Sequence, residues 1–315
     1  MLTPRAMALS VAFVALLAAG PIGAQQAADQ WFTLDTLAPN VWAAMDNPKA
    51  AQRSYANAGI IIGEDGIVVV DTMTGDDVAG RLLPEIRALT SQPVRFVVNT
   101  HYHGDHVAGN RLFVDAGAQL IAHRNVRRWI LPENLRMLGD TPNPELKAFV
   151  EKFVAPTFGY TEAVDLYLGS RVVHVRSFPG HTGGDSVVIV PDAKVVFAGD
   201  LLWKGVVPNT IDGTTNAWIQ TLSTLAADYA GHTFVPGHGG IATTQDVIAI
   251  RDYLATVQTL VADARAAGKT GAAVTPIVLA ALKDKYGAWE GFEYLAPLNI
   301  AQADAEQSGK KRIPQ

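Results

Sequence analysis

The most informative absence in this chain is cysteine, of which its 315 residues contain none. This absence excludes a cysteine nucleophile, an iron–sulfur cluster, thiolate-ligated zinc and a disulfide framework. Any metal ion must therefore be bound by histidine and carboxylate side chains. The G-x-S-x-G pattern that places a serine nucleophile in many hydrolases is missing as well.

An excess of positive charge is also lacking, because 25 Lys and Arg face 30 Asp and Glu, for a net charge of −5. Nucleic-acid binding needs clustered basic residues, so we expect a small-molecule substrate and no nucleic-acid partner. The composition is 49% hydrophobic and 17% charged, which excludes disordered and fibrous classes. The length alone fits one or two domains.

Long hydrophobic runs are lacking except near the N-terminus, where residues 7–20 are almost wholly apolar. Arg5 is the only charge before this run, and Pro21 and residues 22–24 follow it. The pattern is typical of a signal peptide, and the run is shorter than the roughly 20 apolar residues of a spanning helix. We expect residues 1–24 to be a signal peptide and the mature protein to be periplasmic or secreted, free of the membrane. A permanent membrane anchor is the alternative.

The remaining chain alternates strand and helix patterns. Short β-branched runs predict strands over residues 55–62, 66–71, 94–99, 119–122, 171–178, 186–190, 194–200 and 233–235. Amphipathic patterns predict helices over residues 75–90, 106–114, 216–228, 243–267 and 273–286. These patterns indicate the α/β fold class.

The two halves of this pattern look alike. Each contains a strand that ends in aspartate, at Asp71 and at Asp200, and then enters a helix. We predict two β-rich halves packed face to face with helices outside, as a single domain over residues 25–302. Helices within 243–302 close this domain, and the polar residues 303–315 are expected to be a flexible tail.

One segment, residues 124–160, does not fit the alternation. It carries several aromatic side chains and four prolines, which predict broken helices with apolar faces. Long inserts of this kind often form lids or binding walls. We therefore predict a lid here, with a helical decoration on the surface as the alternative.

Chemistry concentrates in the string His101-Tyr102-His103-Gly104-Asp105-His106, which follows a predicted buried strand and precedes a helix. In an extended chain residues 101 and 103 point to the same side, so two imidazoles can converge on one ion. Gly104 lets the backbone turn, after which Asp105 and His106 can face a second ion. Four potential ligands in six positions therefore predict a metal site.

Two further histidines, His181 and His238, lie in glycine-rich turns that follow apolar strands. Asp200 ends a nearly apolar run, where an unpaired carboxylate would be costly to bury, so a metal or a tight hydrogen-bond network is expected there. The other histidines lack such company and are predicted to be structural: His123, His174 and His232.

The string H-x-H-x-D-H, a later G-H-T, an aspartate at a strand end and a late P-G-H resemble the metallo-β-lactamase superfamily. The resemblance implies a four-layered αββα sandwich and a dinuclear site, usually of Zn²⁺, although the same donors accept iron or manganese. It implies ligands to the first ion at His101, His103 and His181, to the second at Asp105, His106 and His238, and a bridging Asp200. It also implies that Asp71 supports the ligand loop without binding metal.

In such a site two cations lower the pKa of a shared water to about 7, and Asp105 takes the catalytic role of orienting the resulting hydroxide. The β-lactamases of the family that lack a cysteine ligand typically lack a carboxylate at the position of Asp200. Lactonases, thioesterases and phosphodiesterases have one. We predict an exported dizinc hydrolase that opens a cyclic amide or ester. Alternatives are a thioesterase, a phosphodiesterase and a mono-iron sulfur dioxygenase.

Overall fold

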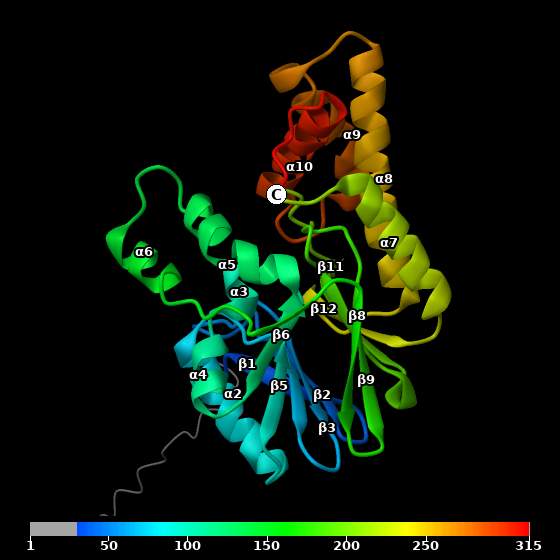
Figure 1. Ribbon diagram of the computed structural model, residues 1–315. Coiled ribbons are helices and arrows are strands. Elements are labelled where there is room, and N and C mark those ends of the chain that lie inside the picture. The colour runs from blue at the N-terminus through cyan, green and yellow to red at the C-terminus, as the bar shows by residue number, and fades with distance from the viewer. Residues whose placement is uncertain (1–29, 315) are drawn as a thin grey trace, which may run out of the picture.

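In the computed structural model, which describes residues 30–314, two β-sheets pack face to face (Figure 1). The expected signal peptide lies outside the described residues. The first sheet has the order β1-β2-β3-β4-β5-β6-β7, and the second β12-β11-β10-β9-β8. The strands are β1 Phe32–Ala38, β2 Val41–Asp46, β3 Ala58–Ile62, β4 Ile67–Val70, β5 Val94–Val98, β6 Gln119–His123, β7 Phe158–Tyr160, β8 Ala163–Leu168, β9 Arg171–Ser177, β10 Ser186–Val190, β11 Val195–Lys204 and β12 Thr233–Gly239.

Helices cover the outer faces of both sheets, and Figure 1 shows α7 to α10 on one side of the molecule and α2 to α6 on the other. The helices are α2 Asp76–Leu89, α3 Gly104–Val107, α4 Asn110–Asp115, α5 Arg124–Met137, α6 Pro144–Val150, α7 Thr215–Asp228, α8 Thr244–Ala266, α9 Thr275–Tyr286 and α10 Phe292–Gln307. Within residues 30–314, no helix combines the length with the apolar character that bilayer crossing needs.

Three apolar layers hold the sandwich together. The central layer lies between the sheets and joins side chains such as Ile61 and Val68 of the first to Val188 and Phe197 of the second. A second layer packs α2 and α4 on the first sheet, and a third packs α7 to α10 on the second. Because both sheets are covered on both faces, strands such as β4 and β10 are continuous β-branched runs. The predicted αββα architecture is confirmed.

The chain path brings the ends of several strands to one edge of the sandwich. Strands β4, β5, β6 and β7 run parallel, with α2, α3 to α4, and α5 to α6 as crossovers. Their carboxyl ends therefore share one edge, as parallel connections require. In the second sheet β11 and β12 are parallel, and the turn between β9 and β10 lies at this same edge because Ser186 N donates to Thr100 O. The histidine motifs sit at this edge.

The strand predictions need correction at several points. Strands β1, β2, β7 and β8 were not predicted: β1 is a half-exposed edge without clean alternation, β2 is rich in alanine and β7 has only three residues. Strand β4 ends at Val70, one residue before Asp71. Strand β11 does not end at Asp200 but continues to Lys204 through an irregularity at Gly199, whose φ of 51° is left-handed. A Cβ at Gly199 would lie 2.6 Å from Thr100 Oγ1, so glycine is required there.

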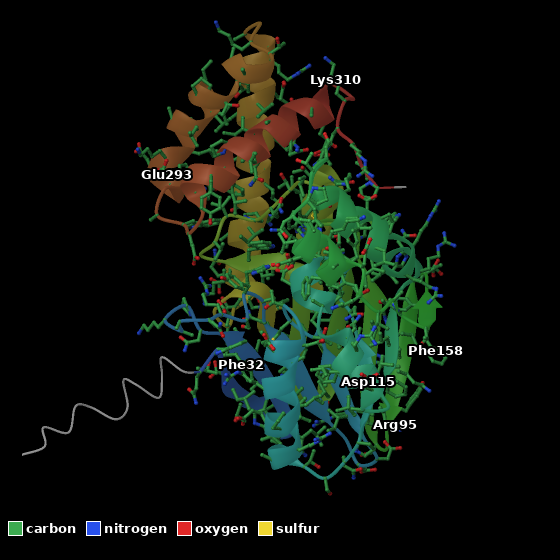
Figure 2. All side chains as sticks on the ribbon, turned by 90° about the vertical axis from the view of Figure 1, so that its left-hand side faces the viewer. Phe32, Arg95, Asp115, Phe158, Glu293 and Lys310 are labelled. Atoms are coloured by element: carbon green, nitrogen blue, oxygen red, sulfur yellow. The ribbon has the colours of Figure 1, made fainter. Side chains whose placement is uncertain are left out.

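The prediction of a flexible tail over residues 303–315 is wrong for much of its length. Helix α10 continues to Gln307, with Ala303 buried. Lys311 donates to Thr210 O, and Arg312 forms two hydrogen bonds with Glu133 of α5. Figure 2 shows α10 between the labelled Glu293 and Lys310 at the top of the molecule, with Arg95 and Asp115 at the bottom. The polar residues of this segment thus form specific ion pairs with the rest of the protein, such as that of Arg312 with Glu133.

The segment 124–160 forms two helices separated near Pro142 and Pro144, whereas Pro132 lies inside α5 without ending it, and its last residues are part of the first sheet as β7. Helix α5 packs on the histidine loop, since Trp129 makes an edge contact with Tyr102 at 5.9 Å between ring centroids. Asn134 Nδ2 also donates to Tyr102 O at 2.7 Å. The helix is therefore a wall beside that loop. Closure as a lid stays a prediction.

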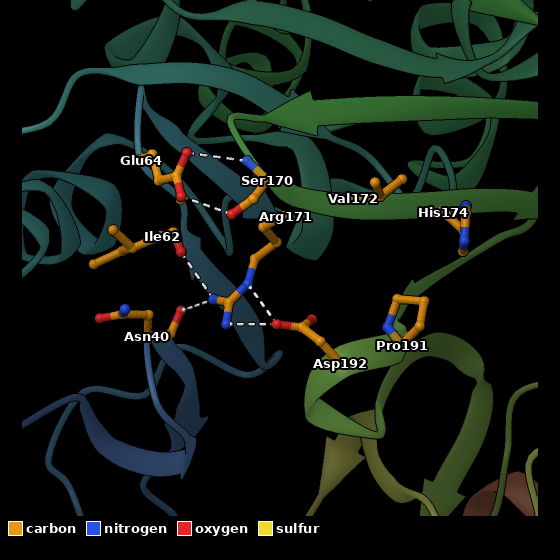
Figure 3. Close-up of a pocket in the computed structure, with 10 residues that line it drawn as sticks. Asn40, Ile62, Glu64, Ser170, Arg171, Val172, His174, Pro191 and Asp192 are labelled. Atoms are coloured by element: carbon orange, nitrogen blue, oxygen red, sulfur yellow. Dashed lines mark hydrogen bonds and ion pairs between the residues drawn. The ribbon is translucent and has the colours of Figure 1, made fainter.

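A cavity of about 770 Å³ lies at the opposite end of the sandwich, beside the β3–β4 turn (Figure 3). Its centre is Arg171, which bonds Asp192 and the carbonyls of Asn40 and Ile62. Glu64 likewise accepts hydrogen bonds from Ser170, so polar contacts connect the two sheets at this end. The guanidinium of Arg171 already donates to these structural partners, and we assign this cavity no functional role.

The central layer leaves no room for a larger residue at Gly59 of β3. A Cβ there would lie 2.5 Å from Cε1 of Phe197 on the facing sheet. We expect Gly59→Ala to lower the free energy of unfolding by about 1–3 kcal/mol in urea titrations. The control is Gly80→Ala on the exposed side of α2, where the nearest atom is 3.7 Å away and helix propensity adds stability of about 1 kcal/mol. Equal effects of both variants would contradict the packing described here.

Candidate metal centre

All seven predicted ligand residues converge at the shared edge of the two sheets. His101, His103, Asp105 and His106 lie in and after the loop that follows β5. His181 comes from the β9–β10 turn, Asp200 from the irregular part of β11, and His238 from the end of β12. Their donor atoms form two groups, within each of which the atoms lie no more than 4.8 Å apart: His101, His103, His181 and Asp200 in the first, and Asp105, His106 and His238 in the second.

The first group is buried and presents three imidazoles to one carboxylate. His181 Nε2 lies 2.9 Å from His103 Nδ1 and 3.3 Å from Asp200 Oδ2. His101 Nε2 lies 3.7 Å from the same carboxylate oxygen. These atoms surround one point, as the ligands of a single cation do.

The second group shares Asp200 with the first. His106 Nε2 lies 3.0 Å from Asp200 Oδ1, and His238 Nε2 lies 3.3 Å from Asp200 Oδ2. Asp105 Oδ2 completes the group at 3.6 Å from His106 Nε2 and 3.3 Å from His238 Nε2. The two oxygens of Asp200 therefore face both groups, which is the arrangement a bridging carboxylate needs.

Each of the five imidazoles has its outer nitrogen against a protein oxygen. The pairs are His101 Nδ1 with Thr100 Oγ1 at 3.1 Å, His103 Nε2 with Asp212 at 3.3 Å, His106 Nδ1 with Asp71 at 2.9 Å, His181 Nδ1 with Asn209 O at 3.0 Å and His238 Nδ1 with Tyr55 O at 2.8 Å. Carbonyls and carboxylates only accept, and the Thr100 hydroxyl already donates to Asp71. Each outer nitrogen therefore carries the hydrogen, and a neutral ring presents a lone pair inward.

The inward-facing atoms test whether these residues fit a metal. Among the described residues, four buried atoms of the cluster have no hydrogen-bond partner: His101 Nε2, His106 Nε2, His238 Nε2 and Asp200 Oδ1. Buried polar atoms without partners are rare and costly. His103 Nδ1 and His181 Nε2 face each other at 2.9 Å, but neither carries a hydrogen when both rings are neutral, so no hydrogen bond joins them. Divalent cations satisfy these atoms, so the donor set fits a pair of metal ions.

Asp71 supports the ligand loop, as the resemblance implied. It accepts from Thr100 N and Thr100 Oγ1, both at 2.7 Å, and from His106 Nδ1 at 2.9 Å. Its φ of 60° is left-handed and uncommon for a non-glycine residue. The carboxylate therefore fixes the start of the loop and one imidazole, and does not face the donor groups.

Tyr55 holds His238 through its main chain. Its φ of 63° lies in the left-handed region, and its N–H donates to Asp46 Oδ1 at 3.0 Å. Ser54 Oγ donates to the same oxygen at 3.1 Å. Asp46 therefore maintains the strained turn that aims Tyr55 O at His238, while 57% of Tyr55 is exposed at the rim.

Burial and the neighbouring charges shift the pKa values of the cluster residues in opposite directions. Burial lowers the pKa of His181 to about 3, with the neighbouring imidazoles acting in the same direction and Asp200 opposing. Burial alone would lower the pKa of His238 as well, but Asp200 and Asp105 outweigh it and raise the pKa to about 10. Burial would raise the pKa of Asp200, but the imidazoles around it hold that pKa well below its usual range. Asp200 is therefore an anion at neutral pH.

Sequence reasoning missed the supporting acceptors. Thr100 is adjacent to the histidine string, but Asn209 and Asp212 lie in a loop with no motif. The remaining histidines lie outside the two donor groups. His123 accepts from Asn125 N at the start of α5, and His174 pairs with Asp165. For His123 and His174 these contacts agree with the prediction of a structural role.

Metal binding should release protons. At pH 7 a metal-free His238, with its pKa of about 10, carries a proton that a cation must displace. We expect zinc titration of the metal-free protein to release protons and the affinity to rise with pH between about 6 and 8. Calorimetry in buffers of different ionisation enthalpy measures this release. Uptake of zinc without proton release, at an affinity independent of pH, would contradict the assignment.

Comparisons with known proteins agree with this geometry. The sequence profile of the metallo-β-lactamase superfamily matches residues 51–245. Two solved structures share the fold: a metallo-β-lactamase from Pontibacter korlensis, with a TM-score of 0.59 and 20% identity over 71% of this chain and 99% of that one, and the DIM-1 metallo-β-lactamase, with a TM-score of 0.58 and 19% identity over 72% and 98%.

Curated relatives match shorter stretches. They include a linear primary-alkylsulfatase of a Pseudomonas species, 23% identical over 57% of this chain and 40% of that protein, and a hydroxyacylglutathione hydrolase of Brucella anthropi, 29% identical over 48% and 52%. The chain thus spans about half the length of these relatives, or less. The profile match covers more than half of the chain, and it coincides with the two-sheet fold and the convergent histidines. The protein belongs to the metallo-β-lactamase superfamily.

Proposed function

We propose that this protein is a dinuclear zinc hydrolase that opens a cyclic ester or amide. The observation that carries the proposal is the orientation of the five imidazoles, whose outer nitrogens are all held by acceptors. The inward nitrogens would bind the ions, with Asp105 completing the second group and Asp200 bridging. Zinc suits an all-imidazole and carboxylate donor set that lacks thiolates.

When bound, the two ions supply Lewis-acid activation of water at neutral pH and stabilise negative charge on the substrate. The chain contributes position and proton handling. Asp105 has the most exposed side chain of the seven, at 29%, and its Oδ2 faces His106 and His238. Its Oδ1 is the atom we assign to accept a hydrogen bond from the attacking water and so to orient it. The other six side chains are more buried and keep bulk water away from the buried donor atoms.

The bridging position of Asp200 supports an ester ahead of a β-lactam. Within the superfamily that the motifs resemble, β-lactamases without a cysteine ligand typically lack a carboxylate at this position, whereas lactonases and thioesterases have one. A thioesterase is the second candidate, because a relative of 29% identity is named a hydroxyacylglutathione hydrolase. The iron-dependent dioxygenase considered from the sequence is distinguished by metal analysis. We also propose export, on the strength of the apolar run over residues 7–20.

Activity should depend on metal. We expect a strong chelator to abolish hydrolysis and added zinc to restore it, since the ions supply the activation of water. A panel of lactones, β-lactams, thioesters and phosphodiesters on the zinc-loaded protein identifies the bond that is cleaved, with lactones expected to react fastest. Elemental analysis should find two zinc ions per chain. Hydrolysis that persists in excess chelator without bound metal would overturn the proposal, and iron with oxygen uptake would favour the dioxygenase.

Asp105 should affect turnover more than folding. We expect Asp105→Asn to lower kcat by about 10²–10⁴-fold, because the neutral amide is a weaker acceptor for the attacking water and a weaker ligand in the second donor group. Thermal unfolding of the variant should match that of the unaltered protein. The control is Asp165→Asn on β8, a half-exposed carboxylate that pairs with His174 and belongs to neither donor group. Full turnover in Asp105→Asn would remove this residue from the mechanism.

A further inference from the structure

One loop, residues 208–212, holds the outer nitrogens of two imidazoles of the first donor group. Asn209 O lies 3.0 Å from His181 Nδ1, and Asp212 Oδ2 lies 3.3 Å from His103 Nε2. The loop joins β11 to α7 and contributes no atom to the donor groups themselves. Its position therefore sets the orientation of two of the three imidazoles in that group.

Asp212 is fixed from several sides. It is buried, and its Oδ2 accepts from Tyr102 Oη at 2.6 Å as well as facing His103. Its Oδ1 accepts from Arg136 Nη2 of α5 at 2.6 Å. A carboxylate with donors on both oxygens has little freedom to rotate, so the imidazole that donates to it is held in one orientation.

The C-terminal part of the chain holds the loop in turn. Asn299 of α10 accepts from Thr210 Oγ1 at 2.9 Å and donates to Pro208 O at 2.8 Å. Lys311 donates to Thr210 O at 2.8 Å, and only 2% of its side chain is exposed. A buried ammonium is costly unless it is paired, and Glu306 lies 3.7 Å away. A displacement of the 208–212 loop would therefore break these hydrogen bonds and leave the buried ammonium of Lys311 without its acceptor.

A second connection reaches the same carboxylate through α5. Arg312 donates to both oxygens of Glu133, at 2.8 and 2.7 Å. Glu133 also accepts from Arg136 Nε at 2.6 Å, and Arg136 donates to Asp212. The last residues of the chain therefore contact the loop directly through Lys311 and the carboxylate of Asp212 indirectly through α5.

We propose that Asp212 is a positioning residue for the metal ligand His103, and that α10 with residues 311–312 locks the 208–212 loop in its supporting position. The inference rests on the proposed function, because it takes the histidine cluster as a metal site. It adds a role for the C-terminal segment: the affinity of the first group for its ion depends on contacts made by residues that lie outside the cluster.

Zinc affinity, measured by competition with a chromogenic chelator, tests the role of Asp212. We expect Asp212→Asn to weaken binding of one ion by about 10–100-fold, because the neutral amide is a poorer acceptor for His103 Nε2. The metal-free variant should still unfold cooperatively but at a lower temperature, because Arg136 loses a charged partner, and Asp212→Glu should recover part of the zinc affinity. The control is Asp165→Asn, which removes a carboxylate that also pairs with a histidine and an arginine.

A substitution at Lys311 tests separately whether the C-terminal residues hold the 208–212 loop in place. We expect Lys311→Met to weaken zinc binding several-fold, whereas the control Lys310→Met, which removes the same charge from an exposed neighbour, leaves it unchanged. If Asp212→Asn does not fold, the comparison of these two lysine variants decides. Unaltered zinc affinity in Lys311→Met and in folded Asp212→Asn would overturn the inference. An unaltered protein that binds no zinc would instead overturn the proposed function, so the two failures are distinguishable.

Discussion

Every imidazole in the cluster donates its outer N–H to a protein oxygen, and the geometry of the whole site depends on this constraint. A free imidazole can exchange which nitrogen carries the hydrogen, but a ring held by a carbonyl or carboxylate cannot. Four rings are fixed in this way and His101 is fixed by the Thr100 hydroxyl, so that all five direct their second nitrogens toward two points that share Asp200. The resulting group of inward-facing atoms is stable only with cations or protons among them, which makes the protein part of the site a preformed receptor for metal.

The fold supplies this constraint from several separate elements. The loop after β5 provides the local string of ligands, supported by Asp71, which directly follows β4. The second sheet adds His181, Asp200 and His238 at the same edge, where Gly199 lets β11 approach Thr100 closely. The helical layer then adds its own contacts through the 208–212 loop. Because the sandwich has a shared central core, the two halves of the site cannot move apart without loss of buried apolar packing.

Much of this could be predicted from the sequence, and the rest had no local signal. The string from His101 to His106 is visible because its ligands are neighbours in the chain, and the buried strands are visible as β-branched runs. Asp212 was missed because its partner His103 lies 109 residues away and no pattern surrounds it. The polar tail looked flexible because a composition cannot show that Lys311 and Arg312 find specific acceptors. Long-range polar contacts depend on tertiary structure, which periodicity does not encode.

A crystal structure of the zinc-loaded protein, with anomalous data collected at the zinc absorption edge, tests this arrangement of ligands. We predict two zinc ions that share Asp200, bound by the inward nitrogens at about 2.0–2.1 Å, while the outer nitrogens keep their present acceptors. A single ion bound through an outer nitrogen, or anomalous signal away from these residues, would contradict it.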